Sequence, residues 1–157
     1  MNEFLGWLTL LLLAQWLFGN IYEAIAFVPN LISLFKLTNA SGEALFKTKR
    51  RSPVAYYVPA VALVAPIETT LAIVSVRNHV PGAGFIVASC ILLFVGVGIT
   101  FYVVRNINLD LFFKPQTDLN RTRKLLHTWS VLNYIRIPVA AAALVTMILW
   151  IRMNVHY

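Results

Sequence analysis

Charged side chains are scarce in this sequence, where Asp, Glu, Lys and Arg make up 12% of the 157 residues. A soluble domain usually carries about 25% charged residues. Hydrophobic residues account for 59%, and apolar runs long enough to span a bilayer cover approximately residues 4–35, 54–76, 85–104 and 123–151. The predicted fold class is therefore all-α, a polytopic membrane protein built as a four-transmembrane-helix bundle, with residues 1–157 forming a single transmembrane domain.

Residues that build metal or nucleotide sites are equally scarce. Cys90 is the only cysteine, so the chain has no internal disulfide and no cysteine-based metal site. His79, His127 and His156 are scattered over different segments, which disfavours a transition-metal or haem site. Gly96-Val-Gly98 lies inside an apolar run and does not follow a strand, so it does not predict nucleotide binding. We expect neither a metal nor a cofactor.

Basic residues and a small-residue cleavage site are also missing from the first segment, so we do not expect it to be a signal peptide. The net charge of +7 resides mainly in two links, residues 36–51 and 105–124. The link at residues 77–84 and the C-terminal end carry one arginine each. The positive-inside rule then predicts both termini outside and both basic links in the cytoplasm. No recognition element accompanies the charge, so nucleic acid is not an expected partner.

Polar side chains interrupt the last apolar segment, Leu125–Trp150. Trp129, Asn133 and Arg136 fall within about 60° of one another on a helix. Arg136 lies ~17 Å along that helix from its basic entrance, hence near the bilayer midplane. A guanidinium at this depth is costly in lipid, so Arg136 is expected to face a protein interior and a partner.

Two glutamates in other segments are the candidate partners of Arg136. Measured from the cytoplasmic side, Glu68 lies ~21 Å deep, Glu23 ~18 Å and Arg136 ~17 to 20 Å. The three are therefore expected to share one layer near the midplane. Glu68 lies on one face of the second segment with Tyr57, Val61, Ala72 and Ser75. In the first segment, Glu23 belongs to a stripe at helical spacing that also contains Trp16, Gly19, Asn20, Phe27 and Asn30.

The remaining segments predict ordinary helix packing and loops. The third segment has Ser89, Gly96 and Thr100 in a row, a spacing typical of close helix contact. Residues 105–124 are expected to form a loop with an interfacial piece around Leu109–Phe113. The first segment is longer than one span, so it tilts, kinks near Pro29 or continues as an interfacial turn.

The predicted polar layer has two interpretations. A buried Glu–Arg pair with asparagines can do no more than fix helix packing. Intramembrane ionisable groups more often mark a functional site, and a second carboxylate exceeds what one arginine needs. We favour a cavity in which Glu23, Glu68 and Arg136 are catalytic and the carboxylates share a proton during acid–base chemistry on an apolar phenol-like or carbonyl substrate. The candidate substrate-binding residues, whose aromatic members equally suit a helix core, are Trp16, Asn20, Tyr57, Trp129 and Asn133.

The last segment reads Trp129-Ser-Val-Leu-Asn133-Tyr-Ile-Arg136, a W-x-x-x-N-x-x-R pattern. It resembles a four-helix membrane family that includes fungal anthrone oxygenases, whose last span tends to close in this way. Phe27-Val-Pro29-Asn-Leu resembles that family's first helix end, and Arg105-Asn106-Ile-Asn108-Leu109 resembles the segment after its third helix. The resemblance implies oxidation of a phenolic or anthrone-like carbon by dioxygen without metal or flavin. Trp129, Asn133 and Arg136 would then line the site of an enolate-like anion, whereas Glu23 and Glu68 match no family motif.

Three functions remain open on the sequence. The first is an anthrone-oxygenase-like enzyme acting on a lipophilic small molecule in an intramembrane pocket. The second is a small transporter or lipophile-binding protein, usually a dimer because four helices leave little room for alternating access. The third is a structural or accessory subunit whose polar cluster only orders the helices. Membrane lipid is an expected partner in each case, and homo-oligomers are left open.

Overall fold

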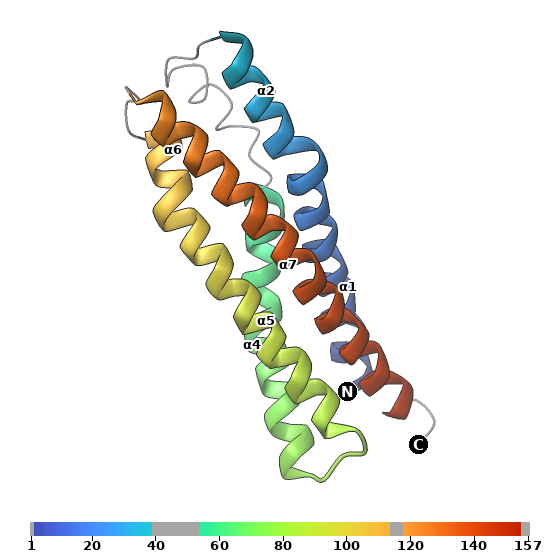
Figure 1. Cartoon of the computed structure of the whole chain (residues 1–157). Helices are drawn as coiled ribbons and strands as arrows, with labels where there is room; N and C mark the ends of the chain where they lie inside the picture. Colours follow the sequence, from blue (N-terminus) through green and yellow to red (C-terminus); the bar gives the residue numbers. More distant parts are fainter. Residues whose placement is uncertain (1, 39–53, 114–117, 155–157) are drawn as a thin grey trace.

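The computed structural model describes residues 2–38, 54–113 and 118–154, and every regular element in these ranges is a helix (Figure 1). Four helical stretches are long and apolar enough to cross a membrane: Glu3–Ser33, Pro59–Arg77, Ala83–Leu111 and Asn120–Asn154. Their outward faces carry large apolar side chains, such as Phe18 and Phe101, that expose most of their surface. The predicted class, an all-α multi-pass membrane protein with four spans, is confirmed.

The first span is one continuous helical stretch with a widened turn in its middle. It consists of α1 (Asn2–Tyr22), the π-helical turn η1 (Glu23–Phe27) and α2 (Val28–Thr38). The Val28 N–H donates to the carbonyl of Glu23, five residues back. Pro29, two residues after the end of this turn, has no N–H to continue the α-helical ladder.

The widened turn changes which side chains of the first span face the interior. A π turn holds one extra residue, so the positions after it are rotated relative to the α-helical pattern. Val28 and Leu31 are buried as a result, and Asn30 is exposed. The predicted stripe therefore holds from Trp16 to Phe27 and is wrong at Asn30.

The third span also continues farther than the sequence predicts. It comprises α5 (Ala83–Val103), a second π-helical turn η3 (Val104–Asn108) and α6 (Leu109–Phe113). The expected loop from residue 105 is wrong for residues 105–108, because the chain stays helical there, and the separate piece expected around Leu109–Phe113 is the helix α6. Ile107 and Leu111 supply the reason, since both are fully buried against the other helices.

The second and fourth spans complete a ring of helices. They are α4 (Val54–Arg77) and α7 (Leu119–Asn154), the latter starting four residues before the predicted residue 123. The helix α7 packs against α5 and α1, and α4 packs against the same two helices. A short turn joins α4 to α5, as the link at residues 77–84 predicts, and Gly82 enters α5 with φ of 71°. The beginning of α1, this turn and the end of α7 lie at one end of the bundle (Figure 1).

The interior holds two apolar cores separated along the bundle axis. The terminal-side core lies toward the chain ends and draws on all four spans. The loop-side core lies toward α2 and α6 and draws on the first, third and fourth spans in the described part of the chain. Buried polar residues lie between them on the first and fourth spans, and the half-buried Thr100 lies between them on the third, which places a polar layer inside the bundle. The terminal-side core consists of Leu13, Trp16, Val64, Leu71, Ala72, Ile86, Leu93, Ala140, Ala143, Met147, Trp150 and Ile151, and the loop-side core of Phe27, Val28, Leu31, Val103, Ile107, Leu111, Leu126 and Trp129.

Candidate functional site: a buried arginine network

Arg136 lies in the middle of α7 and is fully buried. Asn133 and Trp129, one and two turns earlier on the same helix, are also fully buried. The prediction that these three side chains share one inward face is confirmed, because spacings of four and three residues keep side chains on one side of an α-helix. The face follows from helical periodicity alone, whereas the partners of Arg136 depend on how the helices pack.

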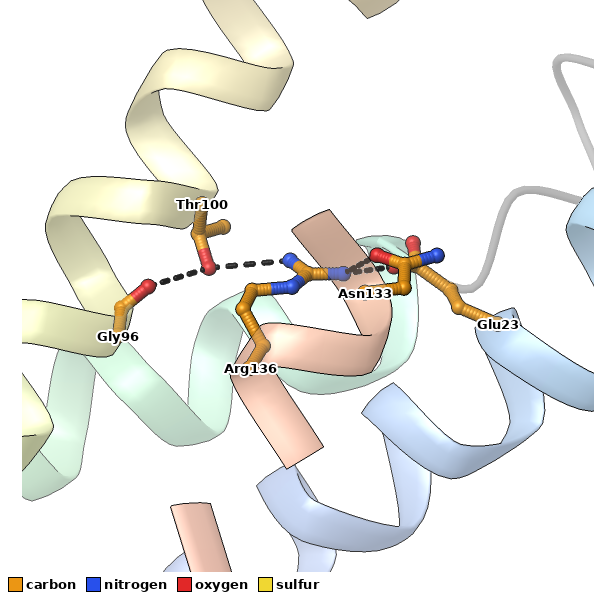
Figure 2. A network of polar contacts seen from close by, with 5 residues as sticks. All are labelled: Glu23, Gly96, Thr100, Asn133 and Arg136. Carbon is orange, nitrogen blue, oxygen red and sulfur yellow. Dashed lines mark hydrogen bonds and ion pairs between the residues drawn. The ribbon is translucent and has the colours of Figure 1, made fainter. Parts of the chain in front are cut away.

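The guanidinium of Arg136 joins three helices (Figure 2). One terminal nitrogen, Nη2, donates to Glu23 Oε2 and to Asn133 Oδ1. The other, Nη1, donates to Thr100 Oγ1 at 3.1 Å. Glu23 is 1% exposed, so this is an ion pair removed from solvent. We call Glu23, Gly96, Thr100, Asn133 and Arg136 the Arg136 network.

Thr100 fixes the far side of the guanidinium. Its hydroxyl donates to the carbonyl of Gly96 at 2.9 Å, so its oxygen is left to accept from Arg136. The sequence places Thr100 in a row of small residues and interprets that row as helix packing only. Its role in the network was missed because a threonine four residues after a glycine gives no hint of a cation on another helix.

Glu23 occupies the first position of the π-helical turn η1. A π turn inside an α-helix is rare and frequently marks a functional position. Here it lies where the first span passes from the terminal-side core to the loop-side core. The carboxylate of Glu23 therefore reaches Arg136 at the boundary between the two cores.

Several buried polar atoms around the network have no hydrogen-bond partner among the described residues. They include Arg136 Nε, Asn133 Nδ2, Trp16 Nε1 and both side-chain polar atoms of Asn20. Most of these atoms are N–H donors. Buried polar groups are normally satisfied by protein, water or a ligand. The group that satisfies this set must supply mainly acceptor oxygens.

Trp16 and Trp129 flank the polar layer from opposite cores. Trp16 belongs to the terminal-side core and packs on Gly96, where a Cβ would lie 2.2 Å from the indole Cη2. Trp129 belongs to the loop-side core and meets Phe27 edge-on, with ring centroids 5.8 Å apart. Tyr57 lies in α4, but its side chain is outside the part that the structure describes.

Glu68 is the predicted site residue that the structure does not bring to Arg136. It is fully buried and lies beside Ser89, between the core residues Val64 and Leu71. Ser89 donates to the carbonyl of Ala143, seven residues beyond Arg136 on α7. The expected common layer of Glu23, Glu68 and Arg136 is therefore wrong for Glu68.

The error arises from the assumption that all spans begin at one depth. Figure 1 shows α4 beginning farther inside the bundle than α2 and α6 reach. A depth counted from Val54 therefore underestimates how far Glu68 lies toward the chain termini. Among the described residues, Glu68 forms no ion pair, and neither of its carboxyl oxygens has a hydrogen-bond partner.

A comparison with known protein families bears on this site. A family model described as anthrone oxygenase matches residues 44–146. The match spans α4, α5, α6 and most of α7, and so contains Gly96, Thr100, Asn133 and Arg136. It does not include Glu23, whose place in the network rests on the structure. No curated protein and no solved structure matches the chain.

Proposed function

Because this chain belongs to the anthrone oxygenase family, we propose that it is a membrane-embedded oxygenase that oxidises an anthrone-like lipophile at the Arg136 network. The observation that carries the proposal is the set of unpartnered N–H groups around a buried cation. An anthrone offers a carbonyl oxygen that becomes an enolate oxygen when the CH2 carbon on the opposite side of the central ring loses a proton. Preorganised donors in a water-poor site stabilise such a developing charge.

The ion pair also suggests how the proton is removed. Glu23 takes a proton from the central CH2 group of the substrate and becomes neutral. Arg136 then pairs with the substrate anion in place of Glu23. One buried ion pair is exchanged for another, so no isolated charge is left in a medium where it would be costly.

Dioxygen completes the proposed reaction without a further reductant. The substrate carbanion gives its electron pair to dioxygen, forming a C–O bond and a peroxide anion, which takes the proton held by Glu23. Removal of the second C–H proton by Glu23, with cleavage of the O–O bond, gives a carbonyl and hydroxide, and the proton on Glu23 converts hydroxide to water. The sum is anthrone plus dioxygen to anthraquinone plus water.

A helix-locking role is the competing function, because the same bonds tie α7 to the first and third spans. The two functions differ in what Glu23 must do. A purely structural role requires only that residue 23 accept a hydrogen bond from Arg136, and a glutamine can also do this. The proposed reaction requires a group that accepts and returns a proton.

The test is oxygen uptake by the purified protein in lipid nanodiscs supplied with anthrone, corrected for uptake without protein. We expect uptake by the wild-type protein and a fall of at least about 100-fold in Glu23→Gln, the range for loss of a general base. Glu3→Gln is the matched control, since Glu3 lies on the same helix and is exposed. Wild-type protein that does not consume oxygen contradicts the proposal, as does an active Glu23→Gln.

A further inference from the structure

Glu68 and Ser89, which we call the Glu68 site, form a second buried polar position away from the Arg136 network. Both residues are fully buried, and the geometry of the described part of the chain gives neither oxygen of the carboxyl group a hydrogen-bond partner. Ser89 interacts with the Glu68 carboxyl group, but its single hydroxyl hydrogen is held by the Ala143 carbonyl at 2.8 Å, so it offers Glu68 only an acceptor oxygen. At least one oxygen of the carboxyl group is therefore left without a donor.

Burying the Glu68 carboxyl group costs free energy unless a further group forms hydrogen bonds with it. A buried carboxyl group without partners loses its hydration and gains nothing in return. The polar groups that interact with it are Ser89 and, on the next residue of α5, the Cys90 thiol, whose sulfur lies 3.7 Å from Thr69 Oγ1. Neither is a cation. A neutral ligand with a hydroxyl group suits this environment, because the hydroxyl can donate to one of the Glu68 oxygens.

The Glu68 site and the Arg136 network are separated along the bundle by a fixed length. Seven residues separate Ser89 from Gly96 on α5, and seven separate Arg136 from Ala143 on α7, which is ~10 Å along each helix. This length is comparable with the long axis of a few fused aromatic rings. The two polar positions are thus far enough apart to contact opposite ends of one such molecule.

The stretch between the two positions is apolar and already holds a planar group. Leu93 and Ala140 are fully buried there, and the Trp16 indole packs on the bare backbone of Gly96. A molecule that joins both positions needs an apolar, flat body with an oxygen at each end. An anthrone with a hydroxyl group on an outer ring has this form.

We propose that Glu68 and Ser89 recognise an outer-ring hydroxyl group of the ligand whose carbonyl oxygen binds at the Arg136 network. This inference rests on the proposed function and adds to it the residues that bind the far end of the ligand. Glu68 then acts in binding and takes no part in the proton transfers at Glu23.

The test compares two stable product analogues, anthraquinone and its derivative with one hydroxyl group on an outer ring away from both carbonyls. Binding is measured by titration calorimetry with the full chain in lipid nanodiscs. We expect the hydroxylated compound to bind about fivefold tighter to the wild-type protein, the ratio that one net hydrogen bond produces. In Glu68→Leu this preference should disappear, and Glu68→Gln, which keeps hydrogen-bonding capacity, should retain part of it.

Other outcomes separate this inference from the proposed function. An unchanged preference in Glu68→Leu overturns the inference and leaves the proposed function standing, provided that Arg136→Lys weakens both compounds. Equal binding of the two compounds to the wild-type protein also overturns it. Absence of binding by either compound overturns both proposals. Thermal unfolding of each variant establishes that the folded protein was titrated.

Discussion

Arg136 and Glu68 are both ionisable and fully buried, yet their surroundings are opposite. Arg136 has a carboxylate, an amide and a hydroxyl oxygen as partners on its terminal nitrogens. Glu68 has apolar core residues on both sides along α4 and no partner for its oxygens. Removing a charge that is paired exposes its partner to the apolar interior, whereas removing an unpartnered group relieves a cost.

This contrast predicts opposite effects of two leucine substitutions. Glu68→Leu should raise the free energy of unfolding by on the order of 1 kcal/mol, because an unsatisfied polar group is replaced by an apolar one of similar size. Arg136→Leu should lower it by about 3 to 5 kcal/mol, because the buried Glu23 carboxylate loses its cation. Denaturant titration in detergent micelles measures both values.

A double variant supplies the control for this prediction. Glu23→Leu combined with Arg136→Leu removes both members of the pair and should be less destabilised than Arg136→Leu alone. Equal destabilisation of the single and double variants would show that the cost comes from lost packing of Arg136 and not from the carboxylate that has lost its cation.

At the level of helices, Trp16 of α1 can pack against α5 because residue 96 is a glycine. A Cβ on Gly96 would lie 2.2 Å from Cη2 and 2.6 Å from Cζ2 of Trp16, and the rigid indole cannot bend away. Gly98, on the same helix, is exposed, and a Cβ there would meet nothing within 4 Å. Packing against Trp16 therefore requires glycine at position 96, whereas no side-chain contact requires glycine at position 98.

Alanine at these two positions should give opposite results. Gly96→Ala should lower the free energy of unfolding by about 1 to 3 kcal/mol, the usual cost of overpacking. Gly98→Ala should leave stability unchanged or raise it by up to about 1 kcal/mol, because alanine favours the helix more than glycine does. Thermal unfolding in the same detergent compares them directly, and similar losses in both variants would contradict the packing that we describe.

The helices also show what the sequence could and could not predict. The lengths of the apolar runs predict the four spans, and helical spacing predicts that Trp129, Asn133 and Arg136 share an inward face. The depth of Glu23 was predicted well enough to make it one of two candidate partners of Arg136, because both helices extend beyond the polar layer in both directions. The depth of Glu68 was not predicted correctly, because the level at which α4 starts depends on tertiary packing. The two π-helical turns escaped prediction because they add one residue without altering the apolar composition.

In the whole molecule, the polar layer lies where the family-matched part of the chain meets the first span. The matched residues 44–146 supply Arg136, Asn133 and Thr100, and the first span supplies Glu23, Asn20 and Trp16. The beginning of α1 and the end of α7 lie at one end of the bundle (Figure 1), as four spans require. That this end faces outward remains a prediction from the charge of the links.

The exchange of ion-pair partners is the central claim, and the absorbance spectrum of bound anthrone tests it most directly. Without dioxygen, the proposed reaction stops once Glu23 has taken the proton and Arg136 has paired with the substrate anion. We expect the wild-type protein in nanodiscs to give the long-wavelength band of deprotonated anthrone under anaerobic conditions. Glu23→Gln should bind anthrone without that band. A spectrum of neutral anthrone on wild-type protein that consumes oxygen when air is admitted would contradict the claim.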